Sequence, residues 1–377
     1  MASKQLSKSA LGIDASLALA DTSIQPSTVK VEGGGVVIIG TTDPTSGGAN
    51  TGVDSVISGS TNHSNSGTHC SISGLSNHSN TGTRCIISGN NNYTNTGGHC
   101  SIVGSNNHTN TASYCSISGQ YNNGNSGHYT SISGNSNSSN SGTHCQISGE
   151  NNSNSAKPNT GTHCSISGSG NYNNSGSYCQ ISGVGNYTNT GGYCSISGKY
   201  NSTNSGSYSL ISGKSNSTNS GSYTTISGKG NSTNSGSYTT ISGKSNYSNS
   251  GTHCSISGGS NHANSGDYCQ ISGSSNYSNS GHRSQISGGY NPSNSGDYCQ
   301  ISGQSNSSNS GNYSQISGRY NYSNSGHSCS ISGYSNTTNT GDYCQISGNG
   351  NQGNFGTHST IGGKVASGST KIATSGT

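Results

Sequence analysis

The thirteen cysteines are the residues of this chain best suited to chemistry, because thiols form disulfides and bind zinc. They recur at one spacing, at positions 70, 85, 100, 115, 145, 164, 179, 194, 254, 269, 299, 329 and 344. Elsewhere the same slot holds a small hydroxyl residue, as in Thr130, Ser209 and Ser284. We therefore expect a column of free, stacked thiols. Disulfides between neighbouring repeats or chains are the alternative, and the odd count would leave one sulfur over.

Histidine precedes cysteine in several repeats, which raises the question of a zinc site. The pairs are His69–Cys70, His99–Cys100, His144–Cys145, His163–Cys164 and His253–Cys254. Adjacent residues of a strand face opposite sides, and a straight column of sulfurs does not surround a tetrahedral ion. Tyrosine takes the histidine slot in many repeats, such as Tyr114 and Tyr178. We expect no metal, and interpret this slot as an outward aromatic ladder or a contact with a neighbouring chain.

Acidic residues are few and scattered along the chain. Three of the nine carboxylates, Asp267, Asp297 and Asp342, share one variable slot, and no pair recurs at a catalytic spacing. The sequence has no phosphate-binding loop, calcium-binding repeat or nucleophile elbow. We therefore expect no catalytic residues, no cofactor and no enzymatic activity.

Four consecutive repeats carry a lysine after the conserved-looking glycine, at Lys199, Lys214, Lys229 and Lys244. A charged edge of this kind discourages lateral pairing of sheets. The alternative is a surface-binding stripe for anionic glycans. Since only 6% of residues are charged and the net charge is +4, we expect no nucleic-acid partner.

The repeat itself predicts the fold. Isoleucine recurs every fifteen residues, as in Ile72, Ile87, Ile102 and Ile117, in step with Cys70, Cys85, Cys100 and Cys115 and with Asn77, Asn92 and Asn107. The Ser-Ile-Ser-Gly alternation is typical of a strand, and the period is too short for a helix-turn-helix unit. We predict an all-β protein, a parallel β-solenoid (β-roll) of about 20 coils spaced about 4.8 Å apart, forming a rod roughly 95 Å long. Ile and Asn would form axial ladders.

The second half of each repeat reads Asn-x-Ser/Thr-Asn-Ser/Thr-Gly, which we interpret as a second short strand. Gly and Asn would supply corners with positive φ. Each coil would bury Ile, the Cys/Ser/Thr residue and a small Ser/Thr pair, which is little for a single chain. We therefore expect a homo-oligomer, most simply a trimer, or an end-to-end filament.

The chain divides into four segments. Residues 1–30 are expected to cap, anchor or join the solenoid, with a secretion signal as the alternative. Residues 31–54 supply an incoming strand and the first coil, with the apolar run from Gly33 to Ile39 as a fully buried strand. Residues 55–362 form the solenoid, with a four-residue insertion near 156–159, and residues 363–377 are a tail. No stretch is long enough to span a bilayer.

Nearly every repeat contains an Asn-x-Ser/Thr triplet, such as Asn62-His63-Ser64, Asn92-Tyr93-Thr94 or Asn201-Ser202-Thr203. These triplets are glycan acceptors in a eukaryotic secretory pathway. One sugar per coil would leave no room for its neighbours at about 4.8 Å. We therefore expect these residues to serve turns and ladders instead.

The repeat Ser-Ile-Ser-Gly-x-x-Asn-x-Ser-Asn-Ser-Gly-x-x-Cys resembles the head repeats of trimeric autotransporter adhesins, the YadA-like head. The likeness covers residues 55–362 and lies in Ile72, Gly74 and the later Gly82. It differs in its fifteen-residue period, its cysteines and its Ser/Thr/Asn in place of Ala. The resemblance implies a trimeric β-roll at a surface.

Together these observations favour a structural, self-assembling fibre or filament protein. We expect it outside the cell or exposed on a cell, spore or virion surface, with attachment as a further role. The alternative is an adhesin or ice-binding module whose Ser/Thr/Tyr/Asn face recognises a glycan or another regular lattice.

Overall fold

The structure is a computed structural model that describes residues 29–32, 36–39, 50–153, 156 and 158–363. The chain forms two compact units, residues 1–185 (unit 1) and residues 186–377 (unit 2). The predicted N-terminal segment up to residue 28 and the tail from residue 364 lie outside the described residues.

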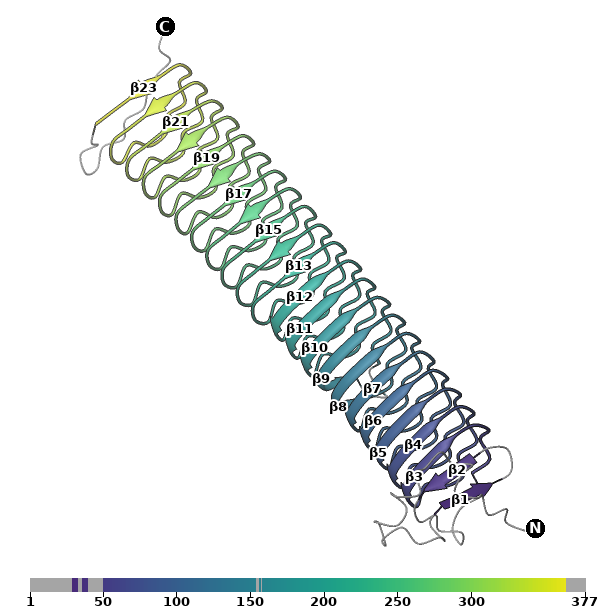
Figure 1. The fold of residues 1–377 in the computed structure, drawn as a ribbon. Coiled ribbons are helices and arrows are strands. Elements are labelled where there is room, and N and C mark those ends of the chain that lie inside the picture. Colours follow the sequence, from purple (N-terminus) through teal and green to yellow (C-terminus); the bar gives the residue numbers. More distant parts are fainter. Residues whose placement is uncertain (1–28, 33–35, 40–49, 154–155, 157, 364–377) are drawn as a thin grey trace, which may run out of the picture. The chain divides into compact units, whose positions relative to one another are not determined.

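Unit 1 begins with two strands that pair antiparallel, β1 (Val29–Glu32) and β2 (Val36–Ile39). From β2 onward the pairing is parallel, and each strand lies beside the next one in sequence (Figure 1). The strands are β3 (Val56–Ser60), β4 (Ser71–Leu75), β5 (Ile86–Asn90), β6 (Ser101–Ser105), β7 (Ser116–Gln120), β8 (Ser131–Asn137), β9 (Gln146–Ser153), β10 (Ser165–Ser169) and β11 (Gln180–Val184). Equivalent residues are partners, such as Ile57 with Ile72.

Unit 2 repeats this arrangement with shorter strands. They are β12 (Ser195–Lys199), β13 (Leu210–Ile211), β14 (Thr225–Ile226), β15 (Thr240–Ile241), β16 (Ser255–Ile256), β17 (Gln270–Ile271), β18 (Gln285–Ile286), β19 (Gln300–Ile301), β20 (Gln315–Ile316), β21 (Ser330–Ile331), β22 (Gln345–Ile346) and β23 (Thr360–Ile361). All pair parallel and in register, as Ile211 does with Ile226. The predicted parallel β-solenoid of about 20 coils with a fifteen-residue repeat is confirmed.

The alternation of the strand puts isoleucine inside each coil. Ile72 is 2% exposed, whereas Ser71 before it is exposed and Ser73 after it is half-buried. From β3 onward, each coil has a glycine with positive φ two residues after this isoleucine, such as Gly74 at +107° within β4. This is the conformation that glycine adopts without steric penalty.

The predicted second strand is wrong, because each coil has one named strand. In the second half, residues bond singly to adjacent coils, as when Thr81 N–H donates to Asn95 O at 3.0 Å. Left-handed residues interrupt the extended backbone there: Ser76, Ser79 and Arg84 have φ between 55° and 57°. The corners are therefore made mainly by Gly, Ser, Thr, Tyr and His, and the ladder asparagines Asn77 and Asn92 do not have positive φ.

The predicted composition of the interior also needs correction. The small Ser/Thr pair does not fill it; in its place, two asparagines of each coil are buried. Asn77 is 0% and Asn80 is 2% exposed, while Thr81 between Asn80 and Gly82 is exposed. The core is thus a column of isoleucine and a column of Cys/Ser/Thr facing two columns of amides.

The insertion leaves the strand register intact. Ser165 of β10 pairs with Gln146 of β9, nineteen residues earlier, and the following partners stay matched. The insertion interrupts the hydrogen bonding in the second half of the coil, where Asn140 Oδ1 is buried and finds no hydrogen-bond partner among the described residues. Asn159 then restarts the column, and its Oδ1 accepts the N–H of Asn174 at 2.9 Å.

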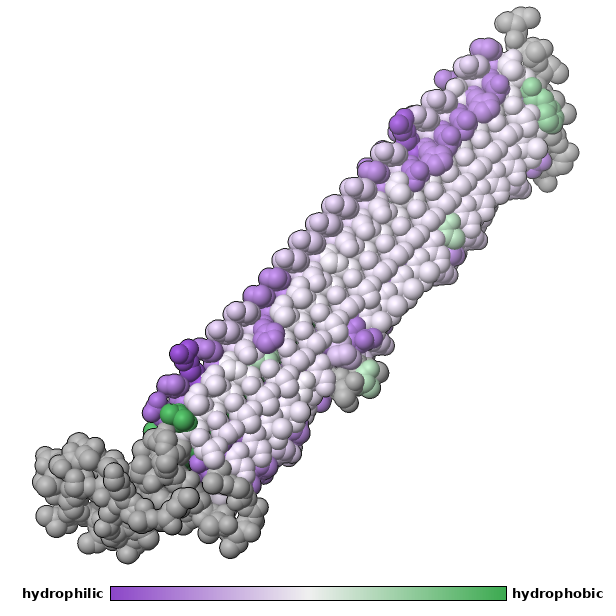
Figure 2. Space-filling model, turned by 90° about the vertical axis from the view of Figure 1, so that its right-hand side faces the viewer, coloured by the Kyte–Doolittle hydropathy of each residue, from purple (hydrophilic) through white to green (hydrophobic). Residues whose placement is uncertain are grey.

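The exposed surface is polar but weakly charged. Figure 2 shows a face covered mainly by residues of near-neutral hydropathy, with hydrophobic residues in isolated places. Exposed apolar side chains such as Leu75, Ile86 and Phe355 are exceptions among Ser, Thr and Gly. Among the described residues, no helix has the length and hydropathy needed to cross a bilayer.

Candidate functional site

The first asparagine column uses its full hydrogen-bonding capacity to join coils. Asn77 Nδ2 donates to Ser73 O of its own coil at 2.8 Å and to Gly89 O of the next at 3.0 Å. Its Oδ1 accepts the N–H of Asn92 at 3.0 Å. A buried amide with every donor and acceptor satisfied stabilises the stack, whereas an unsatisfied one would destabilise it.

The second asparagine column lies three residues further along each coil and makes an amide ladder. Asn80 Nδ2 donates to Asn65 Oδ1 at 3.0 Å and to Asn92 O at 3.0 Å. In unit 2, Asn249 repeats this with Asn234 Oδ1 at 3.0 Å and Asn261 O at 3.1 Å. We did not single out this column from the sequence, although the second Asn of Asn-x-Ser/Thr-Asn signalled it.

Burial of the first asparagine column determines whether the Asn-x-Ser/Thr triplets can carry a glycan in the folded chain. Asn62, Asn92 and Asn201 are each at most 1% exposed, so a glycan on any of them is incompatible with a closed coil. The triplet Asn173-Asn174-Ser175 differs, because Asn173 is exposed.

We expect secretion through a eukaryotic cell to glycosylate the unfolded chain and prevent folding. Blocking oligosaccharyltransferase should restore the β-type circular dichroism spectrum. Glycopeptide mass spectrometry of any folded, secreted fraction should find sugar at Asn173 and none at Asn201. A folded protein glycosylated at Asn201 would contradict the buried placement. Ser175→Ala, which removes only the acceptor Asn173 and leaves the exposed acceptor Asn151 of Asn151-Asn152-Ser153, is the control.

The cysteine column lies inside beside isoleucine. All thirteen cysteines carry free thiols and are 1–5% exposed. Cys70 Sγ donates to Gly82 O at 3.1 Å and accepts the N–H of Cys85 at 3.4 Å. Ser284 makes the same bond, to Gly296 O at 3.0 Å, which explains why serine substitutes for cysteine in this slot.

Most of the thiols whose pKa is shifted are held in their protonated form, whereas hydrogen bonds with the preceding thiols lower the pKa of Cys115 to about 7 and also lower the pKa of Cys164. Burial raises the pKa of Cys299, and a hydrogen bond with Cys115, together with burial, raises the pKa of Cys100 to about 11. Because the thiolate is the nucleophile, protonated thiols that donate to carbonyls are inert. The column therefore contributes packing and axial hydrogen bonds.

The predicted aromatic ladder is confirmed. In unit 2, Tyr193, Tyr208, Tyr223 and Tyr238 are stacked with ring centroids 4.8–4.9 Å apart. In unit 1 the stack runs through His99, Tyr114, Tyr129, His144, His163 and Tyr178. The tyrosines are about half exposed, so only their edges face solvent. Stacking fixes the rings and leaves few free faces for a ligand.

A shorter aromatic column on another side of the coil joins His63, His78, Tyr93 and His108. Desolvation and the nearby His63 lower the pKa of His78, and desolvation lowers that of His108. The imidazoles of His78 and His108 therefore favour the neutral form at pH 7.

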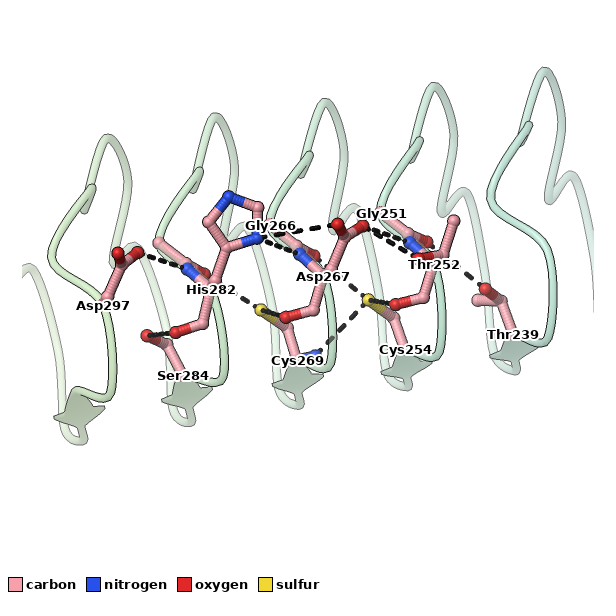
Figure 3. Close-up of polar contacts among 11 residues, drawn as sticks. Thr239, Gly251, Thr252, Cys254, Gly266, Asp267, Cys269, His282, Ser284 and Asp297 are labelled. Carbon is pink, nitrogen blue, oxygen red and sulfur yellow. Dashed lines mark hydrogen bonds and ion pairs between the residues drawn. The ribbon is translucent and has the colours of Figure 1, made fainter.

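The slot before the exposed aromatic residue holds the acidic residues of unit 2 (Figure 3). Asp267 Oδ1 accepts the N–H of Thr252 at 2.7 Å, His282 Nδ1 accepts that of Asp267 at 3.0 Å, and Asp297 Oδ1 accepts that of His282 at 2.7 Å. The chain of acceptors continues through Asn312 to His327 and Asp342.

In other coils a hydroxyl group fills this slot and accepts the same kind of hydrogen bond. For example, Ser222 Oγ accepts the N–H of Ser207 at 3.2 Å. The bond to Thr252 N–H lowers the pKa of Asp267. Since His282 Nδ1 accepts a hydrogen bond from the N–H of Asp267, the ring's own hydrogen lies on Nε2. The acids and histidines are thus tied to backbone amides along a line, and within the described residues no three metal-binding side chains are arranged to hold an ion.

A shallow groove in unit 1 is lined by His144, Gln146, His163, Cys164, Ser165, Tyr178, Cys179 and Gln180. Its residues have other roles, however. Cys164 Sγ donates to Gly176 O at 3.2 Å, and His163 is stacked between His144 and Tyr178. We identify no nucleophile–base pair in the groove.

The lysine column lies on the surface of unit 2. Lys199, Lys214, Lys229 and Lys244 are exposed, and each pairs with the next through a parallel β-bridge. Lys199 Nζ lies 4.8 Å from the ring centroid of Tyr200. Like charges about 5 Å apart repel by roughly 0.8 kcal/mol even in water before salt screening. Placing four ammonium groups in register is therefore electrostatically unfavourable by itself.

Comparison with known protein families and with curated proteins finds no match to this chain. The resemblance to YadA-like head repeats stays a prediction.

Proposed function

We propose that this chain is a structural protein that assembles with copies of itself into a fibre or filament, exposed on a surface or outside the cell. The observation that carries the proposal is the direction of the hydrogen bonds made inside the coils. Its polar side chains bond along the stacking direction, as Asn246 does to Gly258 O at 3.2 Å and to Asn261 N–H at 3.0 Å. This arrangement builds a repetitive scaffold.

The last described coils support growth by addition of further coils. Asn351 Oδ1 and Asn354 Nδ2 are buried and find no hydrogen-bond partner among the described residues. In preceding coils the equivalent atoms bond to the next coil, as Asn336 Oδ1 does to Asn351 N–H at 3.2 Å. A coil contributed by another copy would satisfy these groups, and exposed strand edges pair readily.

The exposed strand face of unit 2 offers a second, lateral route to assembly. Gln270, Gln285, Gln300 and Gln315 are partners in successive parallel strands and are exposed. In-register glutamine ladders on a flat parallel sheet interdigitate with a second such sheet. A homo-oligomer is consistent with either route.

Electron microscopy and sedimentation of the purified full chain test the proposal. We expect particles containing several copies, growing with protein concentration. Gln345 donates its N–H to Ser359 O, so the equivalent N–H of Thr360 points toward the next place in the stack. Thr360→Pro, which lacks this donor, should shorten end-to-end assemblies, and Thr360→Val, which keeps it, should not. Lateral assemblies would be insensitive to both changes, while a chain that stays monomeric at every concentration would refute the proposal.

A further inference from the structure

The lysine column is a row of like charges with no acidic residue in the repeats that carry it. Between residues 151 and 266 the sequence contains no Asp or Glu, so nothing in these repeats neutralises Lys199, Lys214, Lys229 and Lys244. The next four coils hold uncharged residues in this slot, Gly259, Ser274, Gly289 and Gln304, and Arg319 follows them. The fold therefore does not require lysine here. An unfavourable row of like charges that the fold does not need indicates an anionic partner.

The geometry of the row suits a linear partner. Three β-bridges between the lysines hold one ammonium group per coil, about 4.8 Å apart at the backbone. Lysine carries its charge on a flexible stem, so the ammonium groups can adjust to anionic groups of a different spacing. We propose that the lysine column is a docking site for a linear anionic polysaccharide, a function beyond self-assembly.

The neighbouring side chains favour a polysaccharide over a nucleic acid. Ser215 and Ser245 directly follow Lys214 and Lys244. Ser217 and Ser232 come three residues after Lys214 and Lys229, and all four of these hydroxyl residues are half-buried. Hydroxyls can donate to and accept from sugar hydroxyls. A single-stranded nucleic acid would need a row of free aromatic faces for its bases. The tyrosines before the Cys/Ser/Thr slot stack on one another, Tyr208 on Tyr223 at 4.8 Å, and Tyr200 is the one aromatic residue that directly follows a lysine of the column.

Binding to heparin and to polygalacturonate, one sulfated and one carboxylated polymer, tests the proposal with the full chain. The quadruple variant K199Q/K214Q/K229Q/K244Q should fold, because Gln120 and Gln304 occupy this slot naturally. We expect it to bind at least one of the two polymers about tenfold or more weakly than the unaltered chain, and we expect that binding to weaken as salt rises.

The matched control is R84Q/R283Q, which removes two positive charges outside the lysine slot and should change affinity by no more than about twofold. Circular dichroism and electron microscopy of both variants verify folding and assembly independently of binding. Three outcomes would each overturn the polysaccharide assignment. They are no binding of either polymer, equal binding by the quadruple variant and the unaltered chain, and lysine-dependent binding of single-stranded RNA that is tighter than the binding of either polymer.

Discussion

Replacing Asn246 with leucine is expected to lower the free energy of unfolding of unit 2 by about 2 to 5 kcal/mol, because it leaves two backbone groups without partners. Those groups are Ser242 O and the N–H of Asn261, at 2.7 and 3.0 Å from the Asn246 amide, whereas Gly258 O, at 3.2 Å, keeps the N–H of Lys244. Leucine has a similar volume, so lost hydrogen bonds and not a cavity would dominate. Urea denaturation followed by circular dichroism measures the change.

Ser248→Ala is the matched control for this substitution. Ser248 is exposed two residues further along the same coil, and Ala263 occupies the equivalent slot in the next coil with the same left-handed φ. We expect a change within about 0.5 kcal/mol. If Asn246→Leu were as mild as Ser248→Ala, the asparagine columns would not hold the coils together.

Gly243→Ala is expected to destabilise unit 2 by more than about 4 kcal/mol, the range that strain at a special backbone conformation can reach. Gly243 has φ of +103°, and a Cβ atom there would lie 2.0 Å from Gly258 O of the next coil. Neither atom can move aside without separating the coils, because Gly258 O also accepts the N–H of Lys244 at 2.8 Å. Urea denaturation and amide hydrogen exchange of the flanking coils measure the loss.

Gly259 provides the comparison, since it is a glycine in the next coil with space around it. A Cβ atom there would meet only Lys244 O, at 3.8 Å, and Gly259 does not have positive φ. Gly259→Ala should therefore be nearly neutral. Equal effects of the two substitutions would show that glycine acts through general chain flexibility and not through close contact between coils.

Much of the fold followed from the spacing of a few residues. Isoleucine every fifteen residues, alternating with serine, predicted a short strand that stacks on copies of itself. The same reasoning placed Cys70 and Ile72 on one side and Ser71 on the other, as their burial shows. The aromatic ladder also followed from its slot in the repeat.

The second strand and the buried Ser/Thr pair were wrong for a common reason. Asparagine is usually exposed, so the sequence alone favoured placing it at corners and burying the smaller hydroxyl residues. Here Asn77 is buried because its partners, Gly89 O and Asn92 N–H, come from the next coil. No single repeat contains them.

The acceptor column also could not be recognised from the sequence. Asp267, His282 and Asn312 share no charge or shape, and only the stacked backbone shows that each accepts one N–H from the preceding coil. The left-handed corners at Ser76 and Arg84 also depend on bonds to other coils, such as Ser76 N–H to Ser60 O at 3.0 Å.

By itself, then, the sequence determined the period, the strand and the columns of like residues, since these depend on spacing along one chain. Only the tertiary structure decided which polar residues lie inside and where the backbone bends, because a buried amide or a left-handed corner is stable only with partners supplied by neighbouring coils.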